Sequence, residues 1–435
     1  MKKFKVILAI VLSAILALAV VGCGGGRDPS GGKTDTKTIE IWISTVNQPK
    51  YFMGWFKNAF ERENEGITLK FTPSTNIGSG LDVTLDGADA PDMVATSGGL
   101  VVPTLKAGNR ILSLESVVGP IKSTFHETAL LNQIDNEFWC APIFGFSSPV
   151  IYYNKTVFDN NGWTAPTTYD ALVDLCKDIK ALKNKNGEQM YQTIVSGYSY
   201  HILQAMTGKT MTEEQLSALI ADKTSDAANP LNNAGMENAL KWVEKMRQDG
   251  IYATNFTGYT TTQSASDFAT QKALMIMAPG LDLLDLSETS TFTIGSFSLP
   301  DAPAAFSQEG VQTGSVAGIY NDCLVINSKT KYAEECKKVI EFMYSEAAQQ
   351  ELFNCFLYPV VKTTSYENVD SSIKSLFDSA FKPIYDKARD NGMTIFWMNY
   401  FYKTGMDSGC EQAFKSILNG TKTVSEALSQ LASNW

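Results

Sequence analysis

The sequence contains few residues suited to nucleophilic, acid–base or metal chemistry. Its 435 residues include only two histidines, His126 and His201, and seven cysteines that form no C-x-x-C pair. A zinc site needs closely spaced Cys and His ligands, and a Ser-His-Asp triad needs a histidine beside its nucleophile. Neither a G-x-S-x-G elbow nor a G-x-x-x-x-G-K-[ST] loop occurs. These observations argue against a metalloenzyme, a serine hydrolase and an ATP-binding subunit.

Paired carboxylates remain as a source of chemistry. The chain has 46 Asp and Glu residues, and a count alone does not exclude a glycan hydrolase that uses two carboxyl groups. Ser371-Ser-Ile-Lys374 and Lys403-Thr-Gly405 resemble motifs of penicillin-binding proteins, but they lie close together and have no S-D-N between them. We interpret them as chance, and a cell-surface glycan hydrolase stays as the less favoured alternative.

The first 23 residues have the pattern of a secretion signal that ends at a cysteine. Three lysines precede an uncharged apolar run over 6–21, and the run ends in Val20-Val21-Gly22-Cys23. This apolar-apolar-small-Cys order resembles the bacterial lipobox, in which the signal is removed and the new N-terminal cysteine is acylated. We therefore predict a lipoprotein signal peptide over 1–22 and lipid attachment at Cys23. An ordinary signal with an incidental cysteine is the alternative.

The region that follows the signal is expected to tether a soluble domain to the membrane surface. Residues 23–37 are rich in Gly, Ser, Thr and charge, which is typical of a flexible linker. No later stretch reaches the ~18 uninterrupted apolar residues that a spanning helix needs. The net charge of −10 argues against nucleic acid as a partner and against electrostatic adhesion to anionic lipid. The acyl group at Cys23 is thus the expected membrane link.

The six cysteines beyond Cys23 are scattered widely. An extracytoplasmic location permits disulfides, but a chain of this length does not need them to fold. Whether these cysteines form disulfides is therefore left open, and we favour free, buried thiols. The six are Cys140, Cys176, Cys323, Cys336, Cys355 and Cys410.

Hydrophobic periodicity indicates a large α/β chain with more than one core. The segment 38–44 alternates apolar and polar residues as a strand does, and a helical repeat follows over 52–60. Two more strand patterns at 67–72 and 92–96 complete a strand-helix-strand series, which is typical of a mostly parallel sheet. Further strands are expected at 149–154, 273–278, 292–297 and 322–327. Further helices are expected at 213–221, 234–248, 332–352, 371–389 and 409–434.

An ordered series of short motifs resembles the extracellular solute-binding proteins of ABC importers, and within them the maltose-binding-protein-like, sugar-binding subgroup. The resemblance covers residues 38 to 435, and its most specific part is YNK at 153–155 followed by GWTAPTTYD at 162–170. The other motifs are ADAPD at 88–92, NEFWCAP at 136–142, FATQKALMIM at 268–277, LVINSKTK at 324–331 and FMYSE at 342–346.

This resemblance implies a periplasmic-binding-protein-like fold of two α/β lobes, each a mostly parallel sheet flanked by helices. Three hinge crossings would join the lobes near 146–149, 319–323 and 366–373. Lobe 1 would contain 38–147 and 322–370, and lobe 2 would contain 148–321 and 371–435. The resemblance also implies a monomer that binds a small carbohydrate between its lobes, delivers it to the membrane subunits of an ABC permease, and needs neither a cofactor nor a metal.

A sugar presents C–H faces and hydroxyl groups, so its site needs flat aromatic rings and polar side chains. In open α/β sheets such groups lie on loops at the carboxyl ends of strands. Together with the resemblance, this rule selects eleven ligand-binding candidates and no catalytic residue. They are Thr45, Asn47, Thr96, Ser97, Phe146, Ser147, Tyr198, Tyr200, Asp282, Trp397 and Tyr400.

Asp282 is a departure from the family pattern. Much of the family has a tryptophan after a Gly-Pro or similar turn, and this chain has Gly280-Leu281-Asp282 there. The change replaces an aromatic stacking surface by a carboxylate, which argues against a maltodextrin in particular. An acidic cleft also keeps a peptide or a polyamine open as the ligand. The favoured function is a lipid-anchored, extracytoplasmic binding component of a carbohydrate importer, without enzymatic activity.

Overall fold

The computed structural model describes most of the chain beyond the N-terminal region. The described residues are 36–45, 48, 50–78, 80–97, 101–130, 133–145, 148–221, 231–318, 322–395 and 406–433. The signal segment, Cys23 and five of the candidate ligand residues lie outside these ranges. The five are Asn47, Phe146, Ser147, Trp397 and Tyr400.

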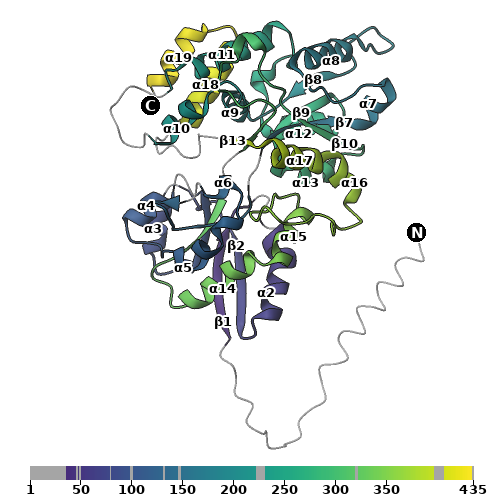
Figure 1. Cartoon of the computed structure of the whole chain (residues 1–435). Helices are drawn as coiled ribbons and strands as arrows, with labels where there is room; N and C mark the ends of the chain where they lie inside the picture. The colour runs from purple at the N-terminus through teal and green to yellow at the C-terminus, as the bar shows by residue number, and fades with distance from the viewer. Residues whose placement is uncertain are drawn as a thin grey trace, which may run out of the picture. The chain divides into compact units, whose positions relative to one another are not determined.

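The first sheet has five strands in the order β2-β1-β3-β12-β6. Figure 1 labels two of them, β1 and β2. Ile39, Ile41 and Ile43 of β1 are fully buried, because β1 is an inner strand and its alternate residues point into the core. β1 pairs in parallel with β2 and β3, whereas β12 pairs antiparallel with β3 and β6. The strands are β1 (Lys37–Ile43), β2 (Ile67–Pro73), β3 (Met93–Ser97), β6 (Ala141–Pro142) and β12 (Asp322–Ile326).

Short helices surround the first sheet, and Figure 1 shows α2 and α14 beside it. The core here is strongly aromatic, since the rings of Phe52, Phe56 and Phe60 lie on the buried side of the first helical segment and pack against one another. These helices are η1 (Lys50–Phe56, a π-helix), α2 (Lys57–Glu63), α3 (Leu81–Asp86), α4 (Val102–Ala107), α5 (Glu115–Val118), η2 (Gly119–Thr124), α6 (Glu127–Leu130), α14 (Ala333–Met343) and α15 (Glu346–Asn354).

The second sheet has four strands in the order β10-β7-β9-β8. All residues of β7 and β9 are buried, because helices cover both faces of this sheet. β8 and β9 run parallel, whereas β7 pairs antiparallel with both β9 and β10. The strands are β7 (Pro149–Asn154), β8 (Gln192–Val195), β9 (Ala273–Pro279) and β10 (Ile294–Ser298).

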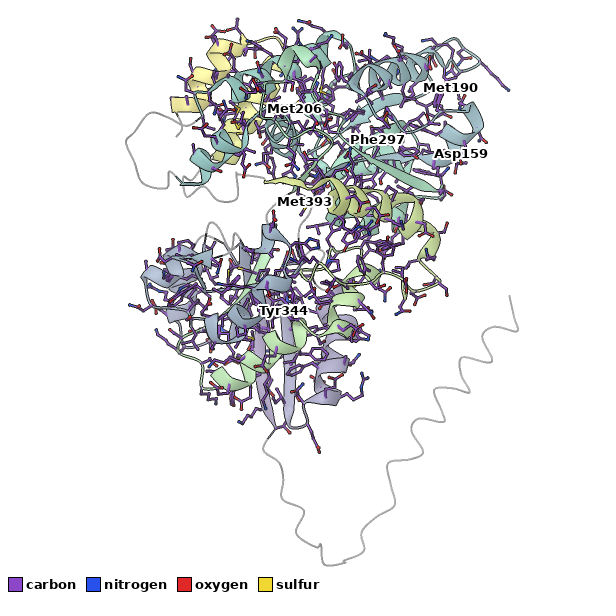
Figure 2. The ribbon with its side chains drawn as sticks, in the orientation of Figure 1. Asp159, Met190, Met206, Phe297, Tyr344 and Met393 are labelled. Carbon is purple, nitrogen blue, oxygen red and sulfur yellow. The ribbon has the colours of Figure 1, made fainter. Side chains whose placement is uncertain are left out.

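Side-chain caps fix where several helices around the second sheet begin. The side chains of Asn154, Thr168, Asn233 and Thr260 each accept a hydrogen bond from a backbone N–H in the first turn. Met206 and Phe297, labelled in Figure 2, belong to the main core of this part. The helices are α7 (Lys155–Asn161), α8 (Tyr169–Ala181), α9 (Ser199–Thr207), α10 (Glu213–Ala221), α11 (Ala234–Gln248), η3 (Phe256–Gly258), α12 (Thr261–Ala269), η4 (Gly280–Asp282), α13 (Leu283–Thr289), η5 (Ala304–Phe306), α16 (Lys374–Leu376), η6 (Phe377–Phe381, a π-helix), α17 (Lys382–Asn391), α18 (Met406–Leu418) and α19 (Val424–Ser433).

Two small sheets complete the described strands. β11 (Val316–Gly318) pairs in parallel with β13 (Met393–Ile395), and β4 (Gln133–Ile134) pairs antiparallel with β5 (Glu137–Phe138). The α/β class is confirmed, but both large sheets are mixed rather than mostly parallel. The reason is the direction in which β12 and β7 run, because each begins at the edge where its neighbouring strand ends. Asp322, the first residue of β12, lies opposite the last residue of β3, and Pro149, the first of β7, lies opposite the last of β9.

An aromatic cluster joins the end of α15 and the segment that follows it to the second sheet. Phe353 and Tyr358 belong to the same core cluster as Phe381 and Tyr385 of the last large helical segment before β13. The rings of Tyr358 and Phe381 stack with centroids 4.3 Å apart, and Phe353 meets Tyr385 edge to face at 5.1 Å. Leu357 and Val360 of the same stretch pack into the first core. The segment therefore contacts both cores.

Candidate functional site

Two predicted residues meet at one edge of the second sheet. β8 and β9 are parallel, so the loops that follow their carboxyl ends lie at the same edge. Tyr198 follows β8 and Asp282 follows β9, and the Tyr198 hydroxyl donates to Oδ2 of Asp282 at 2.8 Å. The adjacent Gly280 N–H donates to the carbonyl of Ser148, next to the start of β7. Both side chains therefore lie at the carboxyl edge of the second sheet.

A close backbone contact fixes the turn that carries Tyr198. A Cβ atom at Gly197 would lie 2.1 Å from the backbone nitrogen of Thr261, so only glycine fits there. The Oγ of Ser196 accepts the N–H of Tyr198 at 3.0 Å, which holds the turn from the other side. These contacts place the Tyr198 ring at the start of α9.

The aromatic side chains of this turn pack around a histidine. The Tyr198 ring stacks on His201 with centroids 5.3 Å apart and an interplanar angle of 17°, and the Tyr200 ring lies 4.1 Å from His201. His201 is largely buried, and burial lowers its pKa to about 3, so its imidazole is neutral at physiological pH. Tyr198 and Tyr200 are both half-buried, and each presents part of its ring outside the core.

The carboxyl group of Asp282 is partly desolvated. Its pKa is raised from 3.8 to about 6, because burial and the nearby Asp285 raise the pKa more than the hydrogen bond from Tyr198 lowers it. Asp282 is therefore ionised at neutral pH but gains a proton in mildly acidic conditions. A carboxyl group accepts hydrogen bonds from sugar hydroxyls, and the ionised carboxylate accepts them more strongly than the protonated form.

We expect Asp282→Asn to stabilise the protein above pH 6 by about 1–2 kcal/mol, with the gain vanishing toward pH 4. The raised pKa means that the folded state binds the proton more tightly than the unfolded chain. Ionisation of Asp282 thus lowers the free energy of unfolding. This penalty is complete above pH 6 and absent below pH 4. The neutral amide avoids this penalty, although it accepts a weaker bond from Tyr198.

Urea denaturation at pH 7.5 and pH 4.5 measures this difference. Asp174→Asn, on the exposed side of α8, is the matched control and should change little at either pH. An Asp282→Asn variant that is equally or less stable than the parent at pH 7.5 would contradict the raised pKa of Asp282.

The first sheet has its own polar cluster at the edge where β1 and β3 end. Gln48 Oε1 accepts the N–H of Ser44 at 2.8 Å, and Gln48 Nε2 donates to Oδ2 of Asp322 at 2.6 Å. Burial raises the pKa of Asp322, and the bond from Gln48 lowers it. Gln48 and Asp322 were not among the sequence candidates. Gln48 lies in the selected loop after the first strand, so the loop rule could have found it, whereas Asp322 needed knowledge that β12 enters the sheet at this edge.

The predicted residues of the first sheet take different places around this cluster. Thr45 is exposed in the bend that follows β1. Thr96 is fully buried, and its hydroxyl already donates to the carbonyl of Ile77. Ser97 is the last residue of β3 and lies opposite Asp322. Thr45 and Ser97 therefore lie beside the Gln48–Asp322 pair, whereas the Thr96 side chain holds a neighbouring loop.

The six cysteines in the described ranges are buried thiols, and the two histidines are partly buried. Cys176 and Cys355 are thiols whose pKa is raised to about 12 by burial, and burial lowers the pKa of His126 to about 4. Among the described residues, no group of three or more His, Cys, Asp or Glu side chains is arranged to hold a metal ion. In the same ranges, no helix is both long and apolar enough to cross a membrane.

Comparison with known families decides the class of protein. The family described as "Bacterial extracellular solute-binding protein" matches residues 55–376, which is most of the chain. The chain belongs to this family. Its members are extracellular solute-binding proteins, so the sequence-based assignment to this class is confirmed.

A curated relative covers nearly the whole solute-binding protein. The chain is 25% identical over 407 residues to the "Multiple sugar-binding protein" of Streptococcus mutans, and the match covers 88% of each chain. That relative is named for binding several sugars.

Solved structures of solute-binding proteins share the fold. A raffinose-bound solute-binding protein aligns with a TM-score of 0.69 at 19% identity, covering 92% of this chain and 98% of the other. A chitin oligosaccharide-binding protein gives 0.69 at 17% identity, covering 92% and 98%. A maltotriose-bound maltodextrin-binding domain from Bdellovibrio bacteriovorus gives 0.67 at 16%, covering 91% and 98%. These likenesses confirm the two-lobe α/β fold of the maltose-binding type.

Proposed function

We propose that this solute-binding protein captures a sugar or oligosaccharide between its two lobes and delivers it to the membrane subunits of an ABC importer. The observation that carries the proposal is the Tyr198–Asp282 pair at the carboxyl ends of β8 and β9, which sets an aromatic face beside a hydrogen-bond acceptor. Sugars need this combination. The sugar-binding name of the relative from Streptococcus mutans supports the same ligand class.

Three of the four sets of core residues support a division into two lobes, and the fourth joins Phe353 and Tyr358 to the second sheet. We propose that lobe 1 contains 38–147 and 322–370 and that lobe 2 contains 148–321 and 371–435. The clusters of the first sheet draw their members from the lobe 1 ranges. The main cluster of the second sheet draws its members from the lobe 2 ranges. A ligand that contacts both lobes stabilises their closed arrangement by its differential affinity, and the permease would then recognise the closed form.

The proposed protein binds its ligand and leaves the ligand's covalent bonds intact. The polar pairs at the two sheet edges, Tyr198–Asp282 and Gln48–Asp322, each join a carboxylate to a hydrogen-bond donor. Such pairs suit recognition of hydroxyl groups. ATP hydrolysis would belong to a separate subunit of the importer, and the binding protein would act as a monomer without a cofactor.

Mass spectrometry of the full chain as purified, under native conditions and then after denaturation, tests the ligand class. The proposal predicts a released neutral saccharide of unchanged covalent structure. A peptide or a polyamine in its place would refute the carbohydrate assignment, and Asp282 is the residue that would favour such a cationic ligand.

We further propose that acylated Cys23 anchors the protein to the outer face of the cell membrane and that residues 23–36 form the tether, one residue shorter than expected because β1 begins at Lys37. Cys23→Ala should abolish incorporation of a labelled fatty acid and release the chain from the membrane fraction. Each acyl chain contributes about 0.8 kcal/mol of membrane affinity per buried CH₂, so losing the chains removes the anchor. Ser30→Ala in the same tether is the control and should keep the label. Retention of label by Cys23→Ala would place the lipid elsewhere.

A further inference from the structure

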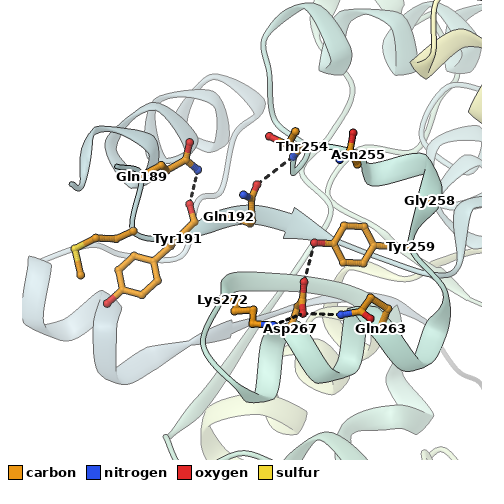
Figure 3. Close-up of a pocket in the computed structure, with 11 residues that line it drawn as sticks. Gln189, Tyr191, Gln192, Thr254, Asn255, Gly258, Tyr259, Gln263, Asp267 and Lys272 are labelled. Carbon is orange, nitrogen blue, oxygen red and sulfur yellow. Dashed lines mark hydrogen bonds and ion pairs between the residues drawn. The ribbon is translucent and has the colours of Figure 1, made fainter. Parts of the chain in front are cut away.

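A second polar groove lies at the opposite edge of the lobe 2 sheet from Tyr198 and Asp282. It has a volume of about 610 Å³, and Gln192 at the start of β8 and Lys272 just before β9 both line it (Figure 3). β9 has seven residues, and a strand rises about 3.3 Å per residue, so roughly 20 Å of sheet separates the groove from Asp282. A small ligand in this groove would not touch the Tyr198–Asp282 pair.

A buried carboxylate organises one wall of the groove. Asp267 is only 8% exposed, and its Oδ2 accepts the hydroxyl of Tyr259 at 2.9 Å. Its Oδ1 accepts Nε2 of Gln263 at 2.7 Å and lies 3.6 Å from the ammonium group of Lys272. Figure 3 shows these side chains converging on Asp267. Their orientations are therefore fixed before any ligand arrives, which lowers the entropic cost of binding.

The opposite wall supplies amide groups and an apolar border. Gln192 Oε1 accepts the N–H of Thr254 at 3.1 Å, which orients this amide and leaves its Nε2 as a further donor. Tyr191 is half-buried and packs against the lobe 2 core. Met190 is 45% exposed and projects from the loop before β8 (Figure 2). It is one of three large hydrophobic side chains that are exposed in the described ranges.

The charges of the groove cancel. Among its lining residues, Asp267 and Lys272 are the two charged side chains, and they form a pair with each other. Burial and the Asp267 bond raise the pKa of Tyr259 to about 12, so this phenol stays neutral at physiological pH. The remaining lining groups are amides, hydroxyls and aromatic rings, a set that suits neutral polyhydroxylated molecules rather than ions.

We propose that this groove is a second, peripheral saccharide-binding site on lobe 2. It binds one or two neutral sugar units between the Tyr259–Asp267 wall and the Gln192–Tyr191 wall. The site does not depend on the ligand assigned to the Tyr198–Asp282 site. Sugar units of a surface glycan and units of a free oligosaccharide share this chemistry, and the test below uses the free form.

Hydrogen exchange of the full chain locates this binding. Maltotriose, raffinose and chitotriose serve as neutral probes, at concentrations up to about 10 mM because a small exposed site binds weakly. At least one probe should slow amide exchange in peptides covering 189–192 and 254–259. The Tyr198→Ala variant should keep this protection, so loss of cleft binding and loss of groove binding are separate outcomes.

Two groove variants and one control complete the test. Gln192→Ala and Tyr191→Ala should each weaken the protection at least tenfold in apparent affinity, whereas Gln350→Ala, on the exposed side of α15, should not. Circular dichroism confirms that the variants are folded. Protection that survives both groove variants, or no protection with any of the three probes, would overturn the proposal.

Discussion

Replacing Tyr198 by alanine is expected to weaken ligand binding on the order of 100-fold. The change removes an aromatic face, worth about 0.5–1.5 kcal/mol for a stacked partner. It also removes the hydroxyl beside Asp282 with which a sugar hydroxyl would hydrogen-bond, and a buried group that loses its partner costs about 1–3 kcal/mol. Together these terms are equivalent to about two factors of ten in the dissociation constant.

Tyr198→Phe separates the two contributions. Phenylalanine keeps the ring and its stacking on His201 but removes the hydroxyl, so it should lose about tenfold. Tyr332→Ala is the control and should bind as the parent does, because Tyr332 is half-buried and packs against the core of the first sheet. Titration calorimetry measures all three variants with the sugar identified from the purified protein. Equal affinities for Tyr198→Ala and the parent would show that Tyr198 does not contact the ligand.

Replacing Gly145 by alanine is expected to lower the free energy of unfolding by on the order of 3 kcal/mol. A Cβ at this position would lie 2.0 Å from the carbonyl oxygen of Pro359 and 2.9 Å from its carbonyl carbon. Both are backbone atoms, so no side-chain rotation relieves the clash. The Gly145 N–H also donates to the carbonyl of Tyr358 at 2.6 Å, and a displaced backbone would lose this bond.

The clash at Gly145 also disturbs the packing of the segment after α15, which contacts both cores. Tyr358 packs on Phe381, and Leu357 packs into the first core, so moving this stretch disturbs both clusters. Gly54→Ala is the matched control, because no atom lies within 4 Å of the Cβ it would add. Urea denaturation should show a lower midpoint for Gly145→Ala and an unchanged or slightly higher one for Gly54→Ala. Equal midpoints would contradict the close approach at Gly145.

Elements with strong local signals were predictable from the sequence. β7 occupies 149–154 as expected, since a continuous apolar run there ends at Asn154, whose side chain caps the next helix. The bounds of α10 and α11 also match the expected 213–221 and 234–248. In each case the apolar period and a capping or helix-breaking residue indicate the same end of the element.

Elements that depend on distant contacts were predicted less well. The single helix expected over 332–352 is two helices, α14 and α15, because Ser345 accepts the N–H of Ala348 and begins a new helix within an apolar stripe that continues. The helix expected over 371–389 contains the π-helical turn η6, and Phe377 in this turn packs against Phe353 from another part of the chain. Periodicity alone does not report either feature.

The same limit applies to the candidate site. Tyr198 and Asp282 were selected separately, because each follows a strand, but their hydrogen bond joins residues 84 positions apart. The sequence does not state which strands are neighbours, and the β8–β9 pairing is what brings the two together. The direction of β12 was likewise unknown, so Asp322 was missed.

Calorimetric titration of the full chain with neutral oligosaccharides tests the central claim most directly. We expect saturable binding of at least one sugar with a micromolar dissociation constant, equivalent to about −8 kcal/mol, and recovery of that sugar unchanged by chromatography. Absence of heat with every sugar, together with saturable binding of a peptide or a polyamine, would contradict the account. Conversion of the recovered sugar into another product would contradict it equally.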